Sequence, residues 1–124
     1  MKILLDVEFD GLPPTVNHLY RSRNGHRYKT LEARNWQEET AGLMLSKSKC
    51  ECYTKAVSLS IIFETNDRRR WDIDNRVKAL QDCLSKAKII KDDAQIQELK
   101  VKREYGEQVK TRIVLMEYED KKVK

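Results

Sequence analysis

The chain is 124 residues long, with 40% hydrophobic and 36% charged residues. This length suits one domain with a single core. The apolar runs are too short to cross a bilayer, and acidic residues interrupt the N-terminal apolar stretch before a signal-type core develops. We therefore expect a cytoplasmic protein without a membrane segment. The net charge of +5 and the sequence pI of about 9.1 favour an anionic partner.

The cysteines indicate neither a disulfide framework nor a zinc site. There are three of them, Cys50, Cys52 and Cys83, and an odd number does not pair off. The first two lack the CxxC spacing of zinc ligands, and neither histidine of the chain lies near them. We interpret all three as ordinary reduced thiols.

The N-terminal part predicts a strand followed by a basic ribbon. Alternation over residues 3–9 predicts a half-buried strand whose inward side chains are Ile3, Leu5, Val7 and Phe9. Asn24-Gly25 predicts a hairpin within residues 15–29, because both residue types tolerate positive φ. The arginines of this ribbon can contact phosphates while a tyrosine stacks on a base. A solvated loop whose tyrosines pack beneath it explains the same residues, and the sequence leaves both interpretations open.

The rest of the chain alternates between helices and strands. Thr30 is a suitable cap for a helix over 31–47, and residues 56–64 form the clearest strand pattern. A second helix is predicted over 74–87, with a buried stripe formed by Ile73, Val77, Leu80, Leu84 and Ala87. Strands are predicted over 96–105 and 109–118, and Gly106 between them indicates a hairpin.

This order predicts an α+β domain over residues 1–118, with a mixed sheet covered by two helices on one face. The charged residues 119–124 are expected to form a frayed tail.

Residues 68–78 carry the candidate chemistry, with the sequence Arg-Arg-Arg-Trp-Asp-Ile-Asp-Asn-Arg-Val-Lys. If Asp72 is still extended and Asp74 begins the helix, both carboxylates can reach one ion. Two carboxylates about 4 Å apart repel by roughly 4 kcal/mol at an effective dielectric of 20, which a divalent cation would relieve. Their hard oxygens suit Mg²⁺ or Mn²⁺. Asp93, or its neighbour Asp92, could close the site as a third carboxylate.

The basic residues around these acids suit a phosphodiester substrate. Lys78 could neutralise charge on a phosphate under attack or position a nucleophilic water. The neighbouring guanidinium groups would bind flanking phosphates bidentately, and they belong to Arg68, Arg69, Arg70 and Arg76. Together these residues indicate a metal-dependent phosphodiesterase.

Each component also has a simpler interpretation. A single aspartate before a helix, such as Asp72 or Asp74, is commonly a cap. Asp74 and Lys78 have the spacing of a solvated i,i+4 ion pair, worth roughly 0.3–0.5 kcal/mol. An arginine run is commonly a solvated surface, and Asp92-Asp93 has the composition of a turn.

The sequence resembles the RusA family of Holliday junction resolvases. The resemblance rests on Arg69-Arg70-Trp71-Asp72-Ile73-Asp74-Asn75, then Lys78, then Lys91-Asp92-Asp93-Ala94-Gln95. Upstream, residues 12–20, Leu-Pro-Pro-Thr-Val-Asn-His-Leu-Tyr, look like the P-P-x-x-N-x-x-Y stretch of the family. The similarity spans roughly residues 7–105, and the motifs are strong because they occur in register.

The resemblance implies a homodimer that binds four-way DNA junctions and makes paired symmetric cuts with Mg²⁺, for which Mn²⁺ can substitute. No nucleotide cofactor is expected. It implies metal-binding catalytic roles for Asp72, Asp74 and Asp93, and a catalytic role for Lys78. The role of Asp92 stays open.

The resemblance also extends to the DNA-binding surface. Asn17 and Tyr20 match a loop near the active site of the family, and Arg21 adds a neighbouring cation. Some members carry an aromatic residue three positions after the lysine, proposed to open the junction, where this chain has Gln81. The sequence shows no unambiguous dimer interface, although Val114 and Met116 are candidates.

Two other functions remain open on the sequence. One is a module that binds branched or duplex DNA and has lost catalysis. The other is a restriction-type nuclease that uses Glu98 and Lys100 as an E-x-K motif, although both also suit the exposed side of a strand.

Overall fold

The computed structural model describes residues 2–119 and has the mixed composition of an α+β domain. Its elements are β1 (Ile3–Asp10), α1 (Val16–Leu19), β2 (Tyr20–Arg23), β3 (His26–Lys29), α2 (Leu31–Lys47), β4 (Val57–Thr65), the 3₁₀ turn η1 (Ile73–Arg76), α3 (Val77–Lys86), the 3₁₀ turn η2 (Asp93–Gln95), β5 (Ile96–Tyr105) and β6 (Lys110–Glu117). No helix within residues 2–119 is long and apolar enough to cross a membrane. The predicted α+β class is confirmed, whereas residues 120–124 of the predicted tail lie outside the described residues.

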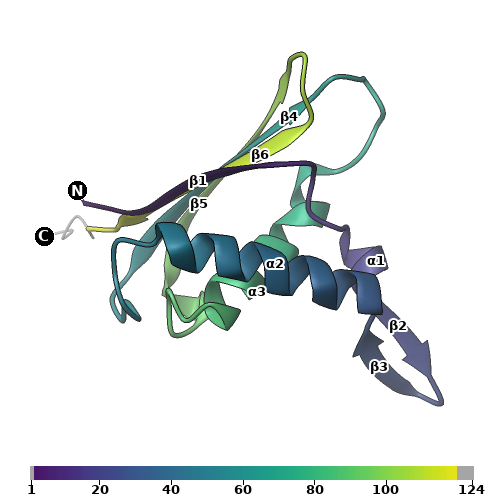
Figure 1. The fold of residues 1–124 in the computed structure, drawn as a ribbon, viewed down its shortest axis with the longest axis horizontal. Coiled ribbons are helices and arrows are strands. Elements are labelled where there is room, and N and C mark those ends of the chain that lie inside the picture. Colours follow the sequence, from purple (N-terminus) through teal and green to yellow (C-terminus); the bar gives the residue numbers. More distant parts are fainter. Residues whose placement is uncertain (1, 120–124) are drawn as a thin grey trace, which may run out of the picture.

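The main sheet has the strand order β1-β6-β4-β5, with β4 and β5 parallel and the other pairs antiparallel. The predicted hairpin around Gly106 is wrong, because β4 lies between β5 and β6. The connection passes over the end of β4 (Figure 1), where Gly106 N donates to Thr65 O at 2.9 Å and Gln108 N donates to Glu64 Oε2 at 3.2 Å. β4 and β6 are the two interior strands, and the inward side chains of β4 are almost completely buried, namely Val57, Leu59, Ile61 and Phe63.

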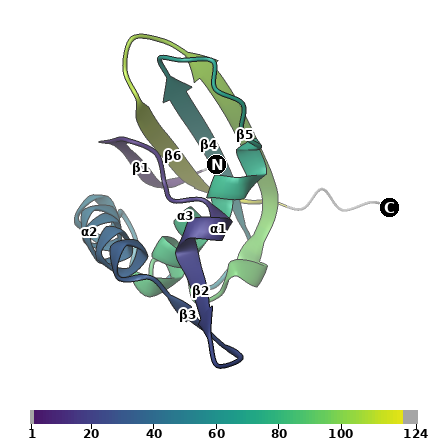
Figure 2. The same ribbon diagram turned by 90° about the vertical axis from the view of Figure 1, so that its right-hand side faces the viewer.

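Helices α2 and α3 pack on one face of this sheet, as predicted (Figure 2). Met44 of α2 and Leu80 and Leu84 of α3 are fully buried against the inward side chains of β4. The predicted bounds of α2 are confirmed, and Thr30 caps it by accepting a hydrogen bond from Ala33 N at 3.1 Å. The core therefore lies between the sheet and the two helices.

The other face of the sheet carries charged pairs. Arg112 donates to both carboxylate oxygens of Asp6, at 3.0 and 2.9 Å, and its hydrogen bond lowers the pKa of Asp6. The candidate interface residues Val114 and Met116 lie half-buried on this face.

Strand β1 departs from the predicted alternation near its start. Its register against β6 shifts between Ile3 and Leu5, so that Leu4 and Leu5 are both buried while Ile3 is 37% exposed. The predicted core position of Ile3 is therefore wrong. A run of aliphatic residues gives no sign of which one a bulge will turn outward.

The predicted second helix begins as the 3₁₀ turn η1 and becomes α-helical only at Val77. Asn75 N donates to the backbone oxygen of Asp72 at 3.1 Å, and no side chain caps the turn. Ile73 is 38% exposed and so leaves the predicted stripe, because a 3₁₀ turn spaces side chains differently from an α-helix. The rest of the stripe is buried or packed on the core, namely Val77, Leu80, Leu84 and Ala87.

The predicted hairpin of the basic ribbon is confirmed as β2 and β3, which project from the domain as a separate two-stranded sheet (Figure 1). Asn24 and Gly25 form its turn with φ of 50° and 77°, the left-handed conformations that this pair tolerates. The short helix α1 before the hairpin has no counterpart in the sequence prediction. Thr30 N donates to Leu19 O at 3.0 Å and closes the foot of the hairpin.

Candidate functional site

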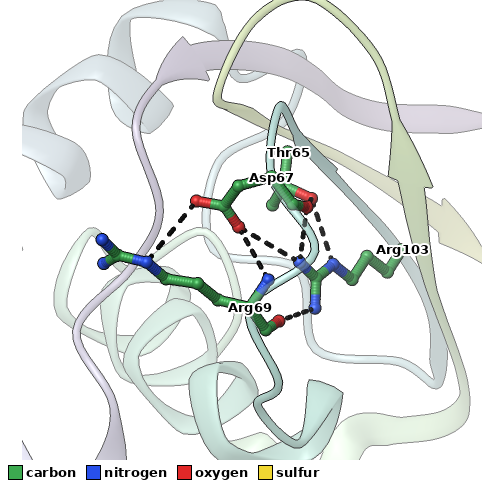
Figure 3. A network of polar contacts seen from close by, with 4 residues as sticks. All are labelled: Thr65, Asp67, Arg69 and Arg103. Carbon is green, nitrogen blue, oxygen red and sulfur yellow. Dashed lines mark hydrogen bonds and ion pairs between the residues drawn. The ribbon is translucent and has the colours of Figure 1, made fainter.

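The loop of residues 66–72, between β4 and η1, is held by Arg103 of β5 (Figure 3). The Nε of Arg103 donates to Thr65 Oγ1 at 3.1 Å, Nη2 to Asp67 O at 3.1 Å, and Nη1 to Arg69 O at 2.8 Å. Its side chain is only 10% exposed. The rigid fork of the guanidinium therefore fixes the backbone that leads to the candidate acids.

Trp71 fastens the end of this loop to the core. Its ring meets Phe63 edge-on, with centroids 5.6 Å apart. The guanidinium carbons of Arg76 and Arg103 lie 4.9 and 4.4 Å from the Trp71 ring centroid, within cation–π range. Burial, together with the charge of Arg103, lowers the pKa of Arg76. Asp72 thus follows directly on an anchored residue.

Asp72 and Asp74 are exposed, and neither carboxylate makes a hydrogen bond or an ion pair with any residue of the described part of the chain. Asp72 has an extended backbone, with φ of −80° and ψ of 128°, whereas Asp74 lies in the first turn of η1. This is the backbone arrangement under which both can reach one ion. Two uncommitted carboxylates fit Mg²⁺ or Mn²⁺, because Mg²⁺ usually takes one or two protein carboxylates and keeps water and substrate oxygens.

Lys78 pairs with Asp82 and not with Asp74. Its Nζ lies 3.3 Å from Asp82 Oδ1, while Lys29 Nζ lies 3.4 Å from Asp82 Oδ2. Burial acts to lower the pKa of Lys78, but the charge and hydrogen bond of Asp82, helped by Tyr20 and Asp93, raise it above the usual 10.5. The simpler interpretation of an Asp74–Lys78 pair is therefore wrong, because the ammonium extends toward the C-terminal end of α3.

Asp92 and Asp93 have different surroundings. Asp92 Oδ1 accepts from Ala94 N at 3.2 Å, and Asp92 N donates to Gln95 Oε1 at 2.8 Å, which makes a reciprocal cap for η2. Asp93 is half-buried, and its Oδ1 accepts from Ser85 Oγ at 2.7 Å. The turn interpretation thus holds for Asp92, whereas Asp93 faces α3.

Asp93 lies near Lys78 but apart from Asp74. Asp93 bonds to Ser85 near the end of α3, whereas Asp74 lies in η1, before the start of α3. Within residues 2–119, no three His, Cys, Asp or Glu side chains gather closely enough to hold a metal ion. Asp93 therefore does not complete a three-carboxylate cluster with Asp72 and Asp74 among the described residues.

Three arginines of the loop point into solvent. The Cζ of Arg68 lies 4.4 Å from the ring centroid of Tyr105, and Arg69 Nε lies 3.9 Å from Asp67 Oδ2. Arg70 is exposed and has no partner among residues 2–119. These three guanidinium groups are available to an anionic ligand.

Arg76 differs from the other arginines because its guanidinium faces the protein. Nη1 donates to Pro13 O at 2.5 Å, and Nε is buried without a hydrogen-bond partner in the described residues. Arg76 therefore joins the loop after β1 to η1.

The remaining predicted DNA-binding residues lie at the foot of the hairpin. Asn17 and Arg21 are exposed and help to line a groove of about 610 Å³. Tyr20 is half-buried, and the Cζ of Arg27 lies 4.1 Å from its ring centroid. Tyr28 is 46% exposed. Tyr20 thus fits the interpretation in which a tyrosine packs beneath the loop. Tyr28 faces solvent and fits the interpretation in which a tyrosine is free to stack on a base.

Glu98 and Lys100 lie on the charged face of the sheet, beside Ser58 and Ser60 of β4. Glu98 Oε1 accepts from Ser58 Oγ at 2.7 Å and lies 3.8 Å from Lys100 Nζ. The helices cover the opposite face, so this pair does not lie with Lys78.

Sequence reasoning missed two residues that organise the site, Arg103 and Asp82. The signal for Arg103 was present, because its alternation with Leu99 and Val101 places a charge on the inward side of β5. Asp82 lies four residues after Lys78, so it had the same helical spacing as Asp74 on the other side.

The chain matches a family model described as Endodeoxyribonuclease RusA over residues 10–116, which include η1, α3 and η2. A similar protein from Aquifex aeolicus (strain VF5), named crossover junction endodeoxyribonuclease RusA, is 30% identical over 90 residues, covering 72% of this chain and 71% of the relative. The protein of that name from Escherichia coli (strain K12) is 32% identical over 89 residues, covering 72% and 74%. The one from Enterobacteria phage HK97 is 28% identical over 92 residues, covering 73% and 76%. The chain belongs to the RusA family of endodeoxyribonucleases.

Proposed function

We propose that this protein is a Mg²⁺-dependent endodeoxyribonuclease that resolves four-way DNA junctions in recombination and repair. The name of the relatives, crossover junction endodeoxyribonuclease, supports branched DNA as the substrate. We further propose that it acts as a homodimer. A two-fold axis would relate two equivalent sites, which suits paired symmetric cuts in opposite strands.

The observation that carries this proposal is the pair of uncommitted carboxylates, Asp72 and Asp74. Buried or neighbouring charges in a folded protein are usually balanced by partners, yet these two have none within residues 2–119. They follow a loop that Arg103 and Trp71 hold in place. Such support is what a metal site requires of its ligands. We assign both carboxylates as ligands of the cation.

The basic residues take roles that follow from their surroundings. When bound, the metal would polarise the scissile phosphate and activate water. The pKa of Lys78 is raised above an ordinary value that is already far above neutral, so the ammonium would offer a full positive charge to a phosphate oxygen. The exposed groups that would bind flanking phosphates are Arg68, Arg69, Arg70, Asn17 and Arg21. Tyr20 and Arg76, which face the protein, would act by positioning these surfaces.

Asp93 is proposed as the third metal ligand, and this assignment requires a rearrangement. Its carboxylate would have to leave the Ser85 end of α3 and approach Asp72 and Asp74. Movement of the turn at 88–95 on DNA binding would supply the approach, and so would a second copy of the chain in the dimer.

The direct test is cleavage of a synthetic four-way junction in Mg²⁺. Wild type is expected to cut the junction and to spare a linear duplex of the same sequence. Asp72→Asn should lower the rate by about a hundredfold or more, because it removes a charged metal ligand. Glu51→Gln, which neutralises an exposed carboxylate in the segment before β4, is the matched control. If wild type cuts no better than Asp72→Asn, the proposal fails.

The lack of a three-carboxylate cluster within residues 2–119 favours one alternative, a branched-DNA binding module without catalysis. That protein would bind junctions tightly and with strong salt dependence but would cut none. Crystals soaked in Mn²⁺ separate the two functions, since anomalous density beside Asp72 and Asp74 supports the nuclease. The restriction-type alternative is tested separately by Glu98→Gln, which it predicts to be inactive.

A further inference from the structure

The foot of the β2–β3 hairpin contains a groove that the proposed metal site does not use. Its volume is about 610 Å³, within the range of roughly 300–1,000 Å³ that is typical of small-molecule sites. It lies between the hairpin and the first turn of α2, and its walls are formed by Asn17, His18, Arg21, Ser22, Tyr28, Thr30, Leu31 and Glu32.

The lining suits a nucleobase better than a phosphate. Tyr28 and Leu31 are 46% and 64% exposed, and they give the groove apolar surface against which a flat ring can stack. Glu32 would repel a phosphate, but its carboxylate can accept a hydrogen bond from an exocyclic amino group of a base. Asn17 offers both a donor and an acceptor, and Arg21 offers a cation for the adjoining phosphate.

The groove is formed in advance, because hydrogen bonds fix its floor. Thr30 Oγ1 donates to His18 O at 3.0 Å, and Thr30 N donates to Leu19 O at 3.0 Å. The side chain of Thr15 bonds to His18 Nδ1 at 2.9 Å. A ligand would therefore meet walls that need little ordering.

A chain of contacts joins the hairpin that carries the groove to the proposed catalytic lysine. Lys29 follows Tyr28 on β3, and its Nζ lies 3.4 Å from Asp82 Oδ2 and donates to Gln37 Oε1 at 2.9 Å. The other oxygen of Asp82 lies 3.3 Å from Lys78 Nζ. The hairpin is therefore held in a fixed position relative to Lys78 by Lys29, whose side chain lies on the opposite side of β3 from Tyr28.

We propose that this groove binds one base displaced from the stack at the branch point of the DNA junction. The base stacks on Tyr28 and presents its exocyclic amino group to Glu32, while Arg21 neutralises its phosphate. This inference rests on the proposed function, since it names the part of that substrate which the hairpin reads. Branch-point bases leave the stack more easily than those inside an arm, so the groove selects branched DNA. It also supplies a junction-opening contact in a chain that has Gln81 in the position of the family's aromatic residue.

The test measures binding in EDTA, where metal-dependent cleavage does not occur. Wild type and Tyr28→Ala are titrated with a four-way junction and with the same junction carrying an abasic site at a branch-point nucleotide. Loss of the base should weaken wild-type binding about tenfold. Tyr28→Ala should bind both junctions equally, at the weaker level, and Tyr28→Phe should behave as wild type. If the abasic site and Tyr28→Ala weaken binding independently, Tyr28→Ala will still bind the two junctions with about a tenfold difference in affinity. That result would overturn the inference.

Two exposed leucines of α2 provide a matched control. Leu31→Ala removes groove surface and should reduce the difference between the two junctions, whereas Leu45→Ala, 58% exposed but outside the groove lining, should leave it unchanged. Equal effects of the two variants would count against the groove.

A second measurement examines the role of Glu32. Wild type should bind junctions with cytosine, adenine or guanine at the branch point more tightly than the thymine junction. Glu32→Ala should lose this preference, and a wild type without any preference would overturn the hydrogen bond to Glu32. Junction cleavage in Mg²⁺ is measured alongside. If the protein cleaves junctions but its binding does not depend on the branch-point base, only the proposed base binding in the groove is overturned. If it neither binds nor cleaves junctions, the proposed nuclease function is overturned as well.

Discussion

The guanidinium carbon of Arg103 lies 4.4 Å from the ring centroid of Trp71, and the same side chain donates hydrogen bonds to Thr65, Asp67 and Arg69. One inward-facing side chain of an edge strand therefore fixes a loop that precedes two candidate metal ligands. The backbone position of Asp72 depends on β5 as much as on its own neighbours in sequence.

Arg103→Met is expected to destabilise the fold by about 3 kcal/mol, because it leaves backbone acceptors unpaired in a mostly buried location. Arg112→Met is the matched control. Arg112 also makes a two-bond pair, but its side chain is 48% exposed, so the loss should be about 1 kcal/mol or less. Urea denaturation measures both. Equal losses would show that the Arg103 network contributes no more than a surface pair.

Arg70 and Arg76 are expected to respond differently to replacement by alanine. Arg70 has no partner within residues 2–119, so Arg70→Ala should leave stability unchanged. It should weaken junction binding and reduce the slope of log K against log salt by about 0.9 for each phosphate that the protein no longer neutralises. Arg76→Ala removes the bond to Pro13 and the interaction with Trp71, so it should lower the melting temperature with little change in slope. A reversed pattern would contradict the positions of the two side chains.

Asp82→Asn removes the charge that raises the pKa of Lys78, so that pKa should fall. A pKa raised in the folded state means that this pairing stabilises the protein below the usual value of 10.5, and that the stabilisation is lost as pH rises through the raised pKa. The variant should therefore be less stable by about 1 kcal/mol near pH 7, with a smaller difference at about pH 11.

The lysine side-chain resonances measure this pKa directly, and urea denaturation at the two pH values measures the stability difference. Glu104→Gln is the control, since its partner Lys102, at 3.0 Å, lies on an exposed part of β5. An unchanged pKa of Lys78 in Asp82→Asn would contradict the ion pair between Lys78 and Asp82.

Cys83 should resist alkylation in the native protein. Burial, followed by the charge of Asp82, raises the pKa of its thiol to about 12 from 9.0. Such a shift lowers the thiolate fraction near neutral pH by about a thousandfold. Cys52 is exposed and serves as the internal control. Iodoacetamide labelling followed by mass spectrometry should modify Cys52 first, and both equally in denaturant. Equal native rates would contradict the packing of α3 on α2.

The sequence was sufficient wherever one local signal decided the structure. Thr30 ends β3 and begins α2 because its hydroxyl satisfies a free backbone N–H, and Asn24-Gly25 tolerates the left-handed turn of the hairpin. The bounds of β5 also follow from local alternation. These features depend on residues within one turn or one strand, so no knowledge of distant contacts is needed.

Features that depend on competition between distant segments could not be predicted. Alternation alone does not show that β4 separates β5 from β6, because strand order is set by pairing between segments that are distant in sequence. Lys78 has Asp74 four residues before it and Asp82 four residues after it, so helical spacing does not decide between them. Asp82 is also held by Lys29, which is distant in sequence. Arg76 resembles the exposed arginines in sequence, yet its partner Pro13 is 63 residues away.

The exposed pair Asp72 and Asp74 has a consequence for laboratory evolution. Since neither carboxylate has a hydrogen-bond or ion-pair partner from residue 2 to 119, exchanging either for asparagine should leave thermal tolerance unchanged. A screen that rewards only survival on heating would not remove chains that have lost these acids. Any laboratory evolution that aims to increase the thermostability of this protein should therefore also select for activity in every round.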